Sequence, residues 1–369
     1  MTSLRLSVLG LVVLVSCVDA AAVEDGLAPF EAELTVASTY VRSRADESSP
    51  EVGLLREGAR VRVTACQPDC TQEGAWALLG TDGAVRASML RRVDPSIAAR
   101  ASDPGPEALI YGRVGKRGIT IYTSASARSR VLSRRRIPRE MAFFPDEPLR
   151  ASGWLHRVDG GYVRAGHVEL LVPSTFAGTH DPQLPLAFVV RPPRSSGLTR
   201  YQTLGVDALG TLPRHAVRIV SARARPAEIP AGARWVDVDL HQQTLTAYEG
   251  DHPVFATLMS SGHGARRDWT HPGLYRVQHK LLYSDMHGER GEPYDVDRVP
   301  YSLYFNANEA LHGTYWHDKF GAPTSHGCVN LSLADARWLF SWAPPALPDQ
   351  WSAVAVTSDH PDALYVYIR

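Results

Sequence analysis

Hydrophobic and polar residues alternate in short runs along most of this chain. The alternation extends from about Tyr40 to Leu90 and returns between Ile121 and Val168, each time broken by turn residues. A period of two places successive side chains on opposite faces of a strand. The 29 glycines and 26 prolines also favour short strands and turns over long helices. The pattern therefore predicts a mainly β protein.

The two alternating stretches match each other in order. Ile121–Ser124 corresponds to Val41–Arg44, and the later strands keep an offset close to 80 residues. A fixed offset of this kind predicts a tandem duplication. The order of an opening strand, a glycine turn, a tryptophan strand and a closing aliphatic stretch resembles the bacterial SH3-like domain. We therefore expect two small SH3-like β-barrels, at 36–93 and 108–172, preceded by a short tether at about 21–35.

The C-terminal part has a different and stricter pattern. Trp235–Leu240 and Gln243–Tyr248 alternate across a polar turn, which predicts a β-hairpin, and Val254–Gly262 predicts a third strand. We expect a separate domain at 232–369. The proline-rich stretch 173–231 before it is expected to be a linker or a degenerate β-module.

One helix is predicted near the end of the chain. Ser332 is suited to cap a short helix that has Asp335 at its third position, after a strand that ends near Asn330. Leu333, Ala336, Leu339 and Phe340 would then face inward.

The N-terminus has the composition of an export signal. Arg5 precedes the apolar run Leu6–Val15, which is too short to span a bilayer, and we assign 1–20 as a signal peptide. The run ends in a sequence that resembles a bacterial lipoprotein signal, in which Cys17 would be lipidated. Ordinary secretion with cleavage after Ala20 is the alternative. Either version predicts export to the periplasm or cell envelope, with a lipid anchor at Cys17 as the single expected membrane contact.

Cysteine spacing and charge narrow the chemistry further. Cys66 and Cys70 lie in one short loop, and in an oxidising compartment they predict a local disulfide. Cys328 is then left as a free thiol, which is unusual in an exported protein unless its chemistry is used. The chain has 39 basic and 39 acidic residues, so its charge does not indicate a nucleic-acid partner.

The free thiol lies in a stretch that can support nucleophilic catalysis. A thiol needs a base to become a nucleophile, and His312 and His326 are candidate bases. Gly327 allows a tight turn that exposes backbone N–H groups, as an oxyanion site requires. A zinc site built from four side chains is the alternative that the same residues allow, and its ligands would be His312, His317, His326 and Cys328.

The full motif carries a family resemblance. It reads Ser325-His326-Gly327-Cys328-Val329-Asn330, with His312-Gly313 upstream. It resembles the signature of the YkuD-type L,D-transpeptidase catalytic domain, and the likeness covers 232–369. The resemblance implies a β-sandwich-like domain with a short helix after the catalytic Cys328, and no metal or organic cofactor.

The resemblance also implies residue roles. Cys328 would attack an amide carbonyl to form a thioester, with His312 as base and the Gly313 carbonyl fixing its orientation. His326 is a second candidate base. Backbone N–H groups of His326, Gly327 and Cys328 would form the oxyanion hole. Supporting roles around the pocket are expected for Ser325, Asn330 and Tyr304.

The substrates implied by the resemblance are peptidoglycan stem peptides. A donor tetrapeptide would lose D-alanine, and an acceptor amine on another stem would resolve the thioester into a 3-3 cross-link. Resolution by water would make the enzyme a carboxypeptidase or hydrolase, and resolution by a wall protein's amine would make it an anchoring enzyme. Carbapenem-type inhibitors are expected to acylate the thiol. A non-catalytic wall-binding protein, or an inactive copy of the domain, is the competing hypothesis, and it would have no need of a low-pKa thiol at Cys328.

Two segments need separate mention. His271 stands where the family's Thr-Pro-x-Gly strand has its proline, so the turn there is expected to differ. Residues 283–297 are polar and predict a loop. In the family such an insertion covers the cleft as a lid, and a plain surface loop is the alternative.

Overall fold

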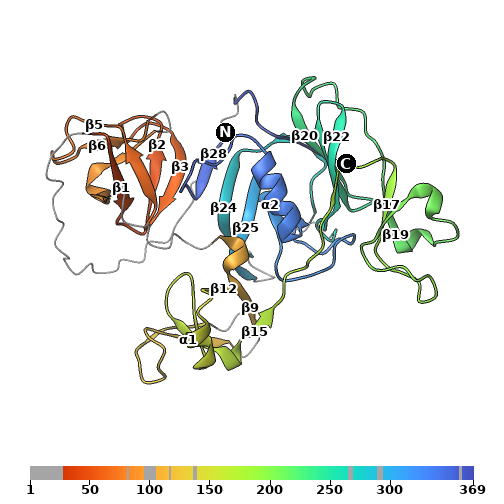
Figure 1. Ribbon diagram of the computed structural model, residues 1–369, viewed down its shortest axis with the longest axis horizontal. Helices are drawn as coiled ribbons and strands as arrows, with labels where there is room; N and C mark the ends of the chain where they lie inside the picture. Colours follow the sequence, from red (N-terminus) through yellow and green to blue (C-terminus); the bar gives the residue numbers. More distant parts are fainter. Residues whose placement is uncertain are drawn as a thin grey trace.

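The structure is a computed structural model that describes residues 28–80, 83–94, 105–115, 118–135, 139–264, 269–288, 294–356 and 360–369. The predicted signal peptide 1–20 and Cys17 lie outside the described residues. The chain is mainly β, as predicted, and Figure 1 shows its strands gathered into several sheets. Among the described residues, the helices are too short or too polar to cross a membrane.

The first β-unit, residues 30–92, consists of two small sheets around one apolar core. One sheet has the order β4-β1-β8, and the other has β3-β2-β7-β6-β5. A disulfide joins Cys66 to Cys70, with Cα atoms 5.2 Å apart. The elements are β1 (Phe30–Leu34), β2 (Ser38–Arg42), β3 (Glu51–Arg56), β4 (Arg60–Val63), β5 (Ala65–Gln67), β6 (Trp76–Leu78), β7 (Ala84–Arg86), η1 (Ala87–Met89) and β8 (Leu90–Arg92).

The second β-unit, residues 106–171, repeats this plan about 80 residues later. β9 pairs with β12 and β15 as β1 pairs with β4 and β8, and β10 pairs with β11 and β14 as β2 pairs with β3 and β7. The shared pairing supports the predicted duplication. The elements are η2 (Pro106–Ala108), β9 (Ile110–Val114), β10 (Ile119–Tyr122), β11 (Val131–Arg135), β12 (Arg139–Phe143), α1 (Glu147–Ala151), β13 (Trp154–His156), β14 (Tyr162–Arg164), η3 (Ala165–His167) and β15 (Glu169–Leu171).

The tether expected at 21–35 is wrong for its last residues, because β1 lies there. Phe30, Ala32 and Leu34 point into the core of the first β-unit, and they alternate with two glutamates. One of these, Glu33, is also buried and contacts Arg91. The alternation is the strand signal that the expected boundary at 36 overlooked.

The connector, residues 173–231, is a folded β-module rather than an extended linker. Its central sheet has the order β18-β17-β19, while β16 joins the sheet of the next domain through β22. Its core clusters around Phe188 and Val189, and one cluster includes Phe320 of the next domain. The elements are β16 (Thr179–His180), β17 (Leu186–Val189), β18 (Thr203–Gly205), η4 (Val206–Ala208), η5 (Arg214–Ala216) and β19 (Val217–Val220).

The C-terminal domain, residues 232–369, packs two sheets and a helix around the largest core cluster. One sheet runs β16-β22-β21-β20-β29-β23, and the other contains β24 to β28. The elements are β20 (Arg234–Asp239), β21 (Thr244–Glu249), β22 (His252–Leu258), β23 (Gly273–Arg276), β24 (His279–His287), β25 (Asp295–Asn306), β26 (Glu309–Gly313), β27 (Val329–Leu331), α2 (Leu333–Trp342), β28 (Ala353–Ala355) and β29 (Tyr365–Ile368).

The predicted helix after Asn330 is confirmed. Ser332 caps α2, and its side chain accepts a hydrogen bond from the backbone N–H of Asp335. Ala336 and Leu339 are buried as expected, whereas Leu333 is only half-buried. This helix follows β27 directly and so fixes the end of the strand that carries the thiol motif.

Residues 283–297 are mostly strand, so the predicted loop is wrong for most of that stretch. β24 continues through His287 and β25 begins at Asp295, and the two strands pair along this length. Their polar side chains are satisfied inside the hairpin, since His287 contacts Asp295 and the backbone N–H of Arg298 donates to Asp285. Polar composition misled the prediction because these partners lie across a strand pair. Residues 289–293 at its tip lie outside the described residues.

The two β-units are joined to the C-terminal domain through its second sheet. β12 pairs in parallel with β25 at Glu140 and Val296, and β3 pairs with β28 at Gly53 and Val354. In Figure 1 the first β-unit lies beside β28 and the second lies beneath β24 and β25. The second β-unit therefore reaches the hairpin that adjoins the thiol motif.

Candidate active site

Two parallel strands place the candidate nucleophile and base. β26 pairs with β27 with Leu311 opposite Val329 and His312 opposite Asn330. One step back along this register, Cys328 lies beside Ala310. The Ala310 N–H donates to Cys328 Sγ, and the thiol contacts the carbonyl oxygen of Asn308 at 3.5 Å.

The turn before β27 is held by a serine and a threonine. Ser325 Oγ accepts the Gly327 N–H at 3.1 Å and donates to the carbonyl of Cys328. Thr270 Oγ1 donates to the carbonyl of Gly327 at 2.7 Å. Gly327 has a φ of 130°, which disfavours any residue with a Cβ. The motif's serine and glycine thus shape the turn that carries Cys328.

The predicted oxyanion hole needs a correction at one donor. The N–H of Gly327 is bonded to Ser325 Oγ, so it cannot also serve a substrate oxygen. The N–H of Cys328 has no acceptor within the part of the chain that the structure describes. It remains the available backbone donor next to the thiol.

His312 has the surroundings of a neutral base. It is 2% exposed, and its Nδ1 lies 3.0 Å from the Gly313 carbonyl, to which Nδ1–H donates. Nε2 is therefore left as the acceptor. Burial lowers the pKa of His312 to about 4, against a smaller opposing effect of the Gly313 carbonyl. Gly313 is tightly packed, since an added Cβ would lie 3.0 Å from Pro300 Cγ.

Burial also shifts the pKa of the Cys328 thiol, and it raises this pKa where a lowered one was expected. It raises the pKa of Cys328 to about 11, the charge of Glu309 adds to the rise, and the Ala310 N–H opposes it. This direction favours a protonated thiol over a preformed thiolate in the free protein. The site therefore holds a protonated thiol together with a neutral imidazole.

His317 contributes to the site in a way that sequence reasoning missed. It entered there only as a zinc ligand, although it follows His312 by a few residues. Its Nδ1 accepts the N–H of Lys319 at 3.2 Å, so the neutral ring carries its proton on Nε2. That nitrogen lies 2.9 Å from the side-chain amide of Asn330 and 3.3 Å from Thr324 Oγ1. Burial lowers the pKa of His317 to about 4.

The contact between His317 and Asn330 fixes how the amide is oriented. As placed, Asn330 Nδ2 faces His317 and Asn330 Oδ1 is buried with no partner among the described residues. Because Nε2 of His317 carries the proton, the amide oxygen belongs at that contact. Asn330 is therefore a support for His317 and the loop before the thiol.

His326 and Tyr304 lie on the outer side of the site. His326 is exposed and stacks on Tyr294 with ring centroids 4.5 Å apart, which brings the β24–β25 hairpin over the motif. The hydroxyl of Tyr304 donates to Ser284 Oγ at 3.2 Å. Burial, with a smaller effect of Cys328, raises the pKa of Tyr304 to about 12. Both rings line the same cleft as the thiol.

The thiol and the histidines of the site open onto one cleft of about 1960 Å³. Its lining includes Cys328, His312 and His317, and it also includes Arg113 and Glu140 from the second β-unit. Arg113 donates to Glu140 and to the carbonyl of Trp316, each at 2.8 Å. The cleft is therefore built by two parts of the chain, which the sequence did not predict.

Comparison with known proteins identifies the domain that contains this cleft. Residues 233–351 match the family model of YkuD, the L,D-transpeptidase catalytic domain. The chain carries a YkuD-type L,D-transpeptidase catalytic domain. A relative from Bacillus subtilis (strain 168), named "Putative L,D-transpeptidase YciB", is 24% identical over 127 residues. The alignment covers 30% of this chain and 61% of that relative, so the chain spans less than two thirds of it.

Solved structures of L,D-transpeptidases also overlap with this chain. The catalytic domain of the Enterococcus faecium L,D-transpeptidase is 20% identical, with 37% of this chain and 98% of that one covered and a TM-score of 0.29. The L,D-transpeptidase of Stackebrandtia nassauensis is 28% identical, with 38% and 60% covered and a TM-score of 0.26. The family match, rather than these partial overlaps, supports the predicted catalytic domain.

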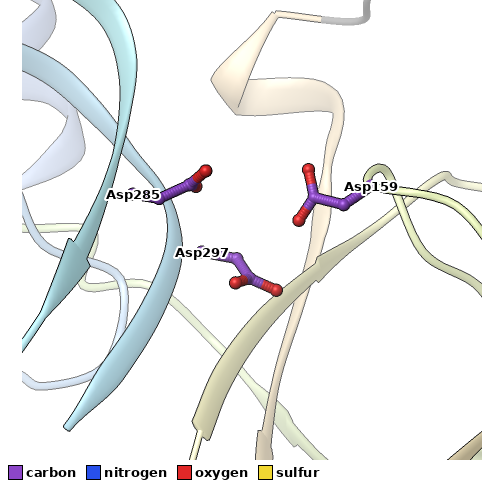
Figure 2. A group of neighbouring side chains, drawn as sticks. All are labelled: Asp159, Asp285 and Asp297. Carbon is purple, nitrogen blue, oxygen red and sulfur yellow. The ribbon is translucent and has the colours of Figure 1, made fainter. Parts of the chain in front are cut away.

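A cluster of three carboxylates that could hold a metal ion lies outside the thiol site of the YkuD-type domain. Among the described residues, one ligand atom from each of Asp159, Asp285 and Asp297 lies within 4.8 Å of the others. The histidines and the cysteine of the zinc hypothesis form no such group in this part of the chain. Figure 2 shows Asp159 across from the other two. Arg139, Arg157 and Arg298 contact these carboxylates. The cluster is thus an ion-pair network that joins the second β-unit to the YkuD-type domain.

Proposed function

We propose that this protein is a peptidoglycan L,D-transpeptidase. The proposal is supported chiefly by one arrangement: a free thiol, Cys328, opens onto a cleft beside a buried neutral His312 whose Nδ1–H is held by the Gly313 carbonyl. This is the base and orienting group that a thiol needs for acyl transfer. The proposed substrate class is the stem peptide of peptidoglycan, and the match to the L,D-transpeptidase catalytic domain supports it.

In the proposed first half-reaction, Cys328 Sγ attacks an amide carbonyl of a donor tetrapeptide. Its proton passes to His312 Nε2, and the Cys328 N–H stabilises the developing oxyanion. His312 then gives the proton to the leaving amine, so D-alanine departs and a thioester remains. In the second half-reaction an acceptor amine resolves the thioester into a 3-3 cross-link. The export-signal composition of residues 1–20 supports the cell envelope as the proposed place of this activity.

Carbapenem labelling with intact mass spectrometry tests the nucleophile. Wild-type protein should gain a single adduct, Cys328→Ala should gain none, and His312→Gln should gain it on the order of 10²-fold more slowly. A matched control is His241→Gln, which changes an exposed histidine on the turn between β20 and β21. An unlabelled wild-type protein with a free Cys328 thiol would contradict the proposal.

Product analysis separates the cross-linking reaction from its alternatives. Purified muropeptides should give 3-3 linked dimers with release of D-alanine. Tripeptides without dimers would identify water as the acceptor, and would make the enzyme a carboxypeptidase. Wall-bound protein without dimers would identify an anchoring enzyme.

A further inference from the structure

Besides His312, a second histidine lines the cleft of the thiol, and it is paired with a carboxylate. His271 Nδ1 contacts Glu309 Oε1, and the His271 N–H lies 3.4 Å from both carboxylate oxygens. Asn306 Nδ2 approaches Glu309 Oε2 at 3.3 Å. The carboxylate is therefore held by donors from two sides, and the pair combines β26 with the segment before β23.

The two members of the pair differ in exposure. Glu309 is 9% exposed, whereas the side chain of His271 is 61% exposed. Because Nδ1–H donates to the carboxylate, Nε2 of His271 is an acceptor, and both residues line the cleft of the thiol. A buried carboxylate that fixes one nitrogen of an accessible imidazole is the arrangement of a positioned base.

The strand register places Glu309 one position before the level of Cys328 and His312 two positions beyond it. Continuing the pairing of β26 and β27 backward brings Glu309 beside Gly327, while His312 is opposite Asn330. A Cβ built on Gly327 would lie 3.9 Å from Glu309 Oε1, which agrees with this register. The charge of Glu309 also acts on the Cys328 thiol. The thiol and both imidazoles, His271 and His312, line the same cleft.

The surface next to His271 is apolar and open. Trp269 is 44% exposed and lines the same cleft. Thr270, between them, is buried and bonded to the Gly327 carbonyl, so this segment is fixed against the turn that carries the nucleophile. A second peptide can therefore pack on Trp269 with its amine near His271 and the thioester.

We propose that His271 is the base that removes the proton from the acceptor amine, with Glu309 as its positioning residue. The inference rests on the proposed function, because it concerns the second half of that reaction. His312 is buried and serves the thiol in the proposed first half-reaction, whereas the side chain of His271 is 61% exposed and accessible to an incoming amine. His271 and Glu309 both fall at positions that the family motif does not explain.

The step balances as follows. The acceptor enters as the free amine, and its nitrogen attacks the thioester carbonyl to form the new C–N bond. His271 Nε2 takes the proton that the nitrogen loses and passes it to solvent. The C–S bond breaks, Cys328 leaves as the thiolate, and it is reprotonated from solvent. The products are an amide and the free thiol, and no oxidant, metal or cofactor takes part.

The test separates the two half-reactions in the full-length protein. The donor is a synthetic stem tetrapeptide and the acceptor is Nα-acetyl-lysine. Rapid quenching measures D-alanine release in the first turnover, and product analysis measures amide formation. His271→Gln should leave first-turnover release within about twofold and slow amide formation on the order of 10²-fold. His241→Gln should change neither rate.

Two further variants distinguish a chemical role from a structural one. Glu309→Gln should slow amide formation by about tenfold, and Glu309→Asp should restore part of it, because a carboxylate is needed to orient His271. Added imidazole should rescue amide formation in His271→Ala, since the exposed position gives imidazole access to the same nitrogen.

The outcomes that overturn the inference are distinct from those that overturn the function. Equal slowing of D-alanine release and amide formation in His271→Gln would show that His271 only holds the turn. No slowing of either would show that His271 takes no part in the reaction. A wild-type protein that releases no D-alanine overturns the proposed function and the inference with it. Carbapenem labelling of each variant checks that its thiol site is folded.

Discussion

Arg113 donates a hydrogen bond from Nη2 to the backbone carbonyl of Trp316 at 2.8 Å, across a separation of 203 residues. Beside it, Tyr111 stacks on Tyr315 with ring centroids 3.9 Å apart. The contacted residues begin the loop between β26, which carries His312, and β27, which follows Cys328. The second β-unit therefore supports the loop between the base and the nucleophile.

The connector supports the next part of the same loop. Arg200 and Tyr201 both bond to Asp318, and Arg218 donates to the carbonyl of Gly321 at 2.8 Å. A loop that is held from two sides can position His317 against Asn330 with little freedom. The domains outside the YkuD-type fold thus contribute directly to the geometry of the site.

Arg113→Ala should lower transfer activity by about tenfold, because loss of a charge-assisted hydrogen bond to the loop loosens His317 and Asn330. Steady-state kinetics on the tetrapeptide donor measure the effect. The matched control is Arg134→Ala, an exposed arginine of the same β-unit. Equal activity of both variants would show that the loop keeps its position without Arg113.

Labelling of Cys328 by iodoacetamide should be slow at neutral pH and should rise toward pH 11, since burial raises its pKa to about 11. Glu309→Gln should shift the labelling profile to lower pH, because one neighbouring negative charge is removed. The measurement is the labelling rate against pH by mass spectrometry. A wild-type profile with a midpoint below pH 7 would contradict this prediction.

Stability should fall between pH 6.5 and pH 4 through His312. An unfolded histidine binds its proton near pH 6.5 and the folded one near pH 4, so the unfolded state holds more protons in this window. The contribution of neutral His312 to the free energy of unfolding is fully present above pH 6.5, and about 3 kcal/mol of it is lost by pH 4. Burial raises the pKa of Asp297 and of Asp335 to about 6, which acts in the opposite direction over the same window.

Comparing the pH dependence of stability in wild type and His312→Gln separates the contribution of the histidine from that of those carboxylates. Urea unfolding at several pH values should give a smaller acid loss for the variant than for the wild type. Parallel curves for the two proteins would mean that His312 is not held neutral by burial.

Arg139→Ala should lower the free energy of unfolding by about 3 kcal/mol, because Asp297 is then left buried with one fewer partner. Arg139 contacts both Asp295 and Asp297 on β25. The double variant Arg139→Met with Asp297→Leu should recover much of this loss, since no buried charge remains unpaired. Chemical denaturation measures the free energy of unfolding of the single and the double variant. A double variant as unstable as Arg139→Ala would indicate that shape, rather than charge, matters here.

Local patterns predicted the local features well. Strict alternation placed β20 and β21, the capping residues placed α2, and the motif placed His312 and Cys328 in one cleft. These features depend on neighbours in sequence or on a compact motif. The tandem order of the two β-units was also predictable, because it repeats along the chain.

Contacts between distant segments could not be predicted in the same way. Arg113 and Glu140 line the cleft because β12 pairs with β25, and no periodicity encodes that pairing. The polar hairpin at 283–297 looked like a loop because its polar side chains find partners across the strand pair, which composition does not reveal. The raised pKa of Cys328 also depends on burial by surrounding strands, which the motif itself does not reveal.

The parallel pairing of β26 with β27 has a consequence for the order of folding. Neighbouring parallel strands require a crossover, and this one depends on residues more than a hundred positions upstream, such as Arg200 and Arg113. Contacts of such long sequence separation are slow to form. We expect the reactive centre to mature late, after both supporting modules have condensed. Acyl transfer by the thiol would then begin only in the finished molecule, once His312 is in place beside it.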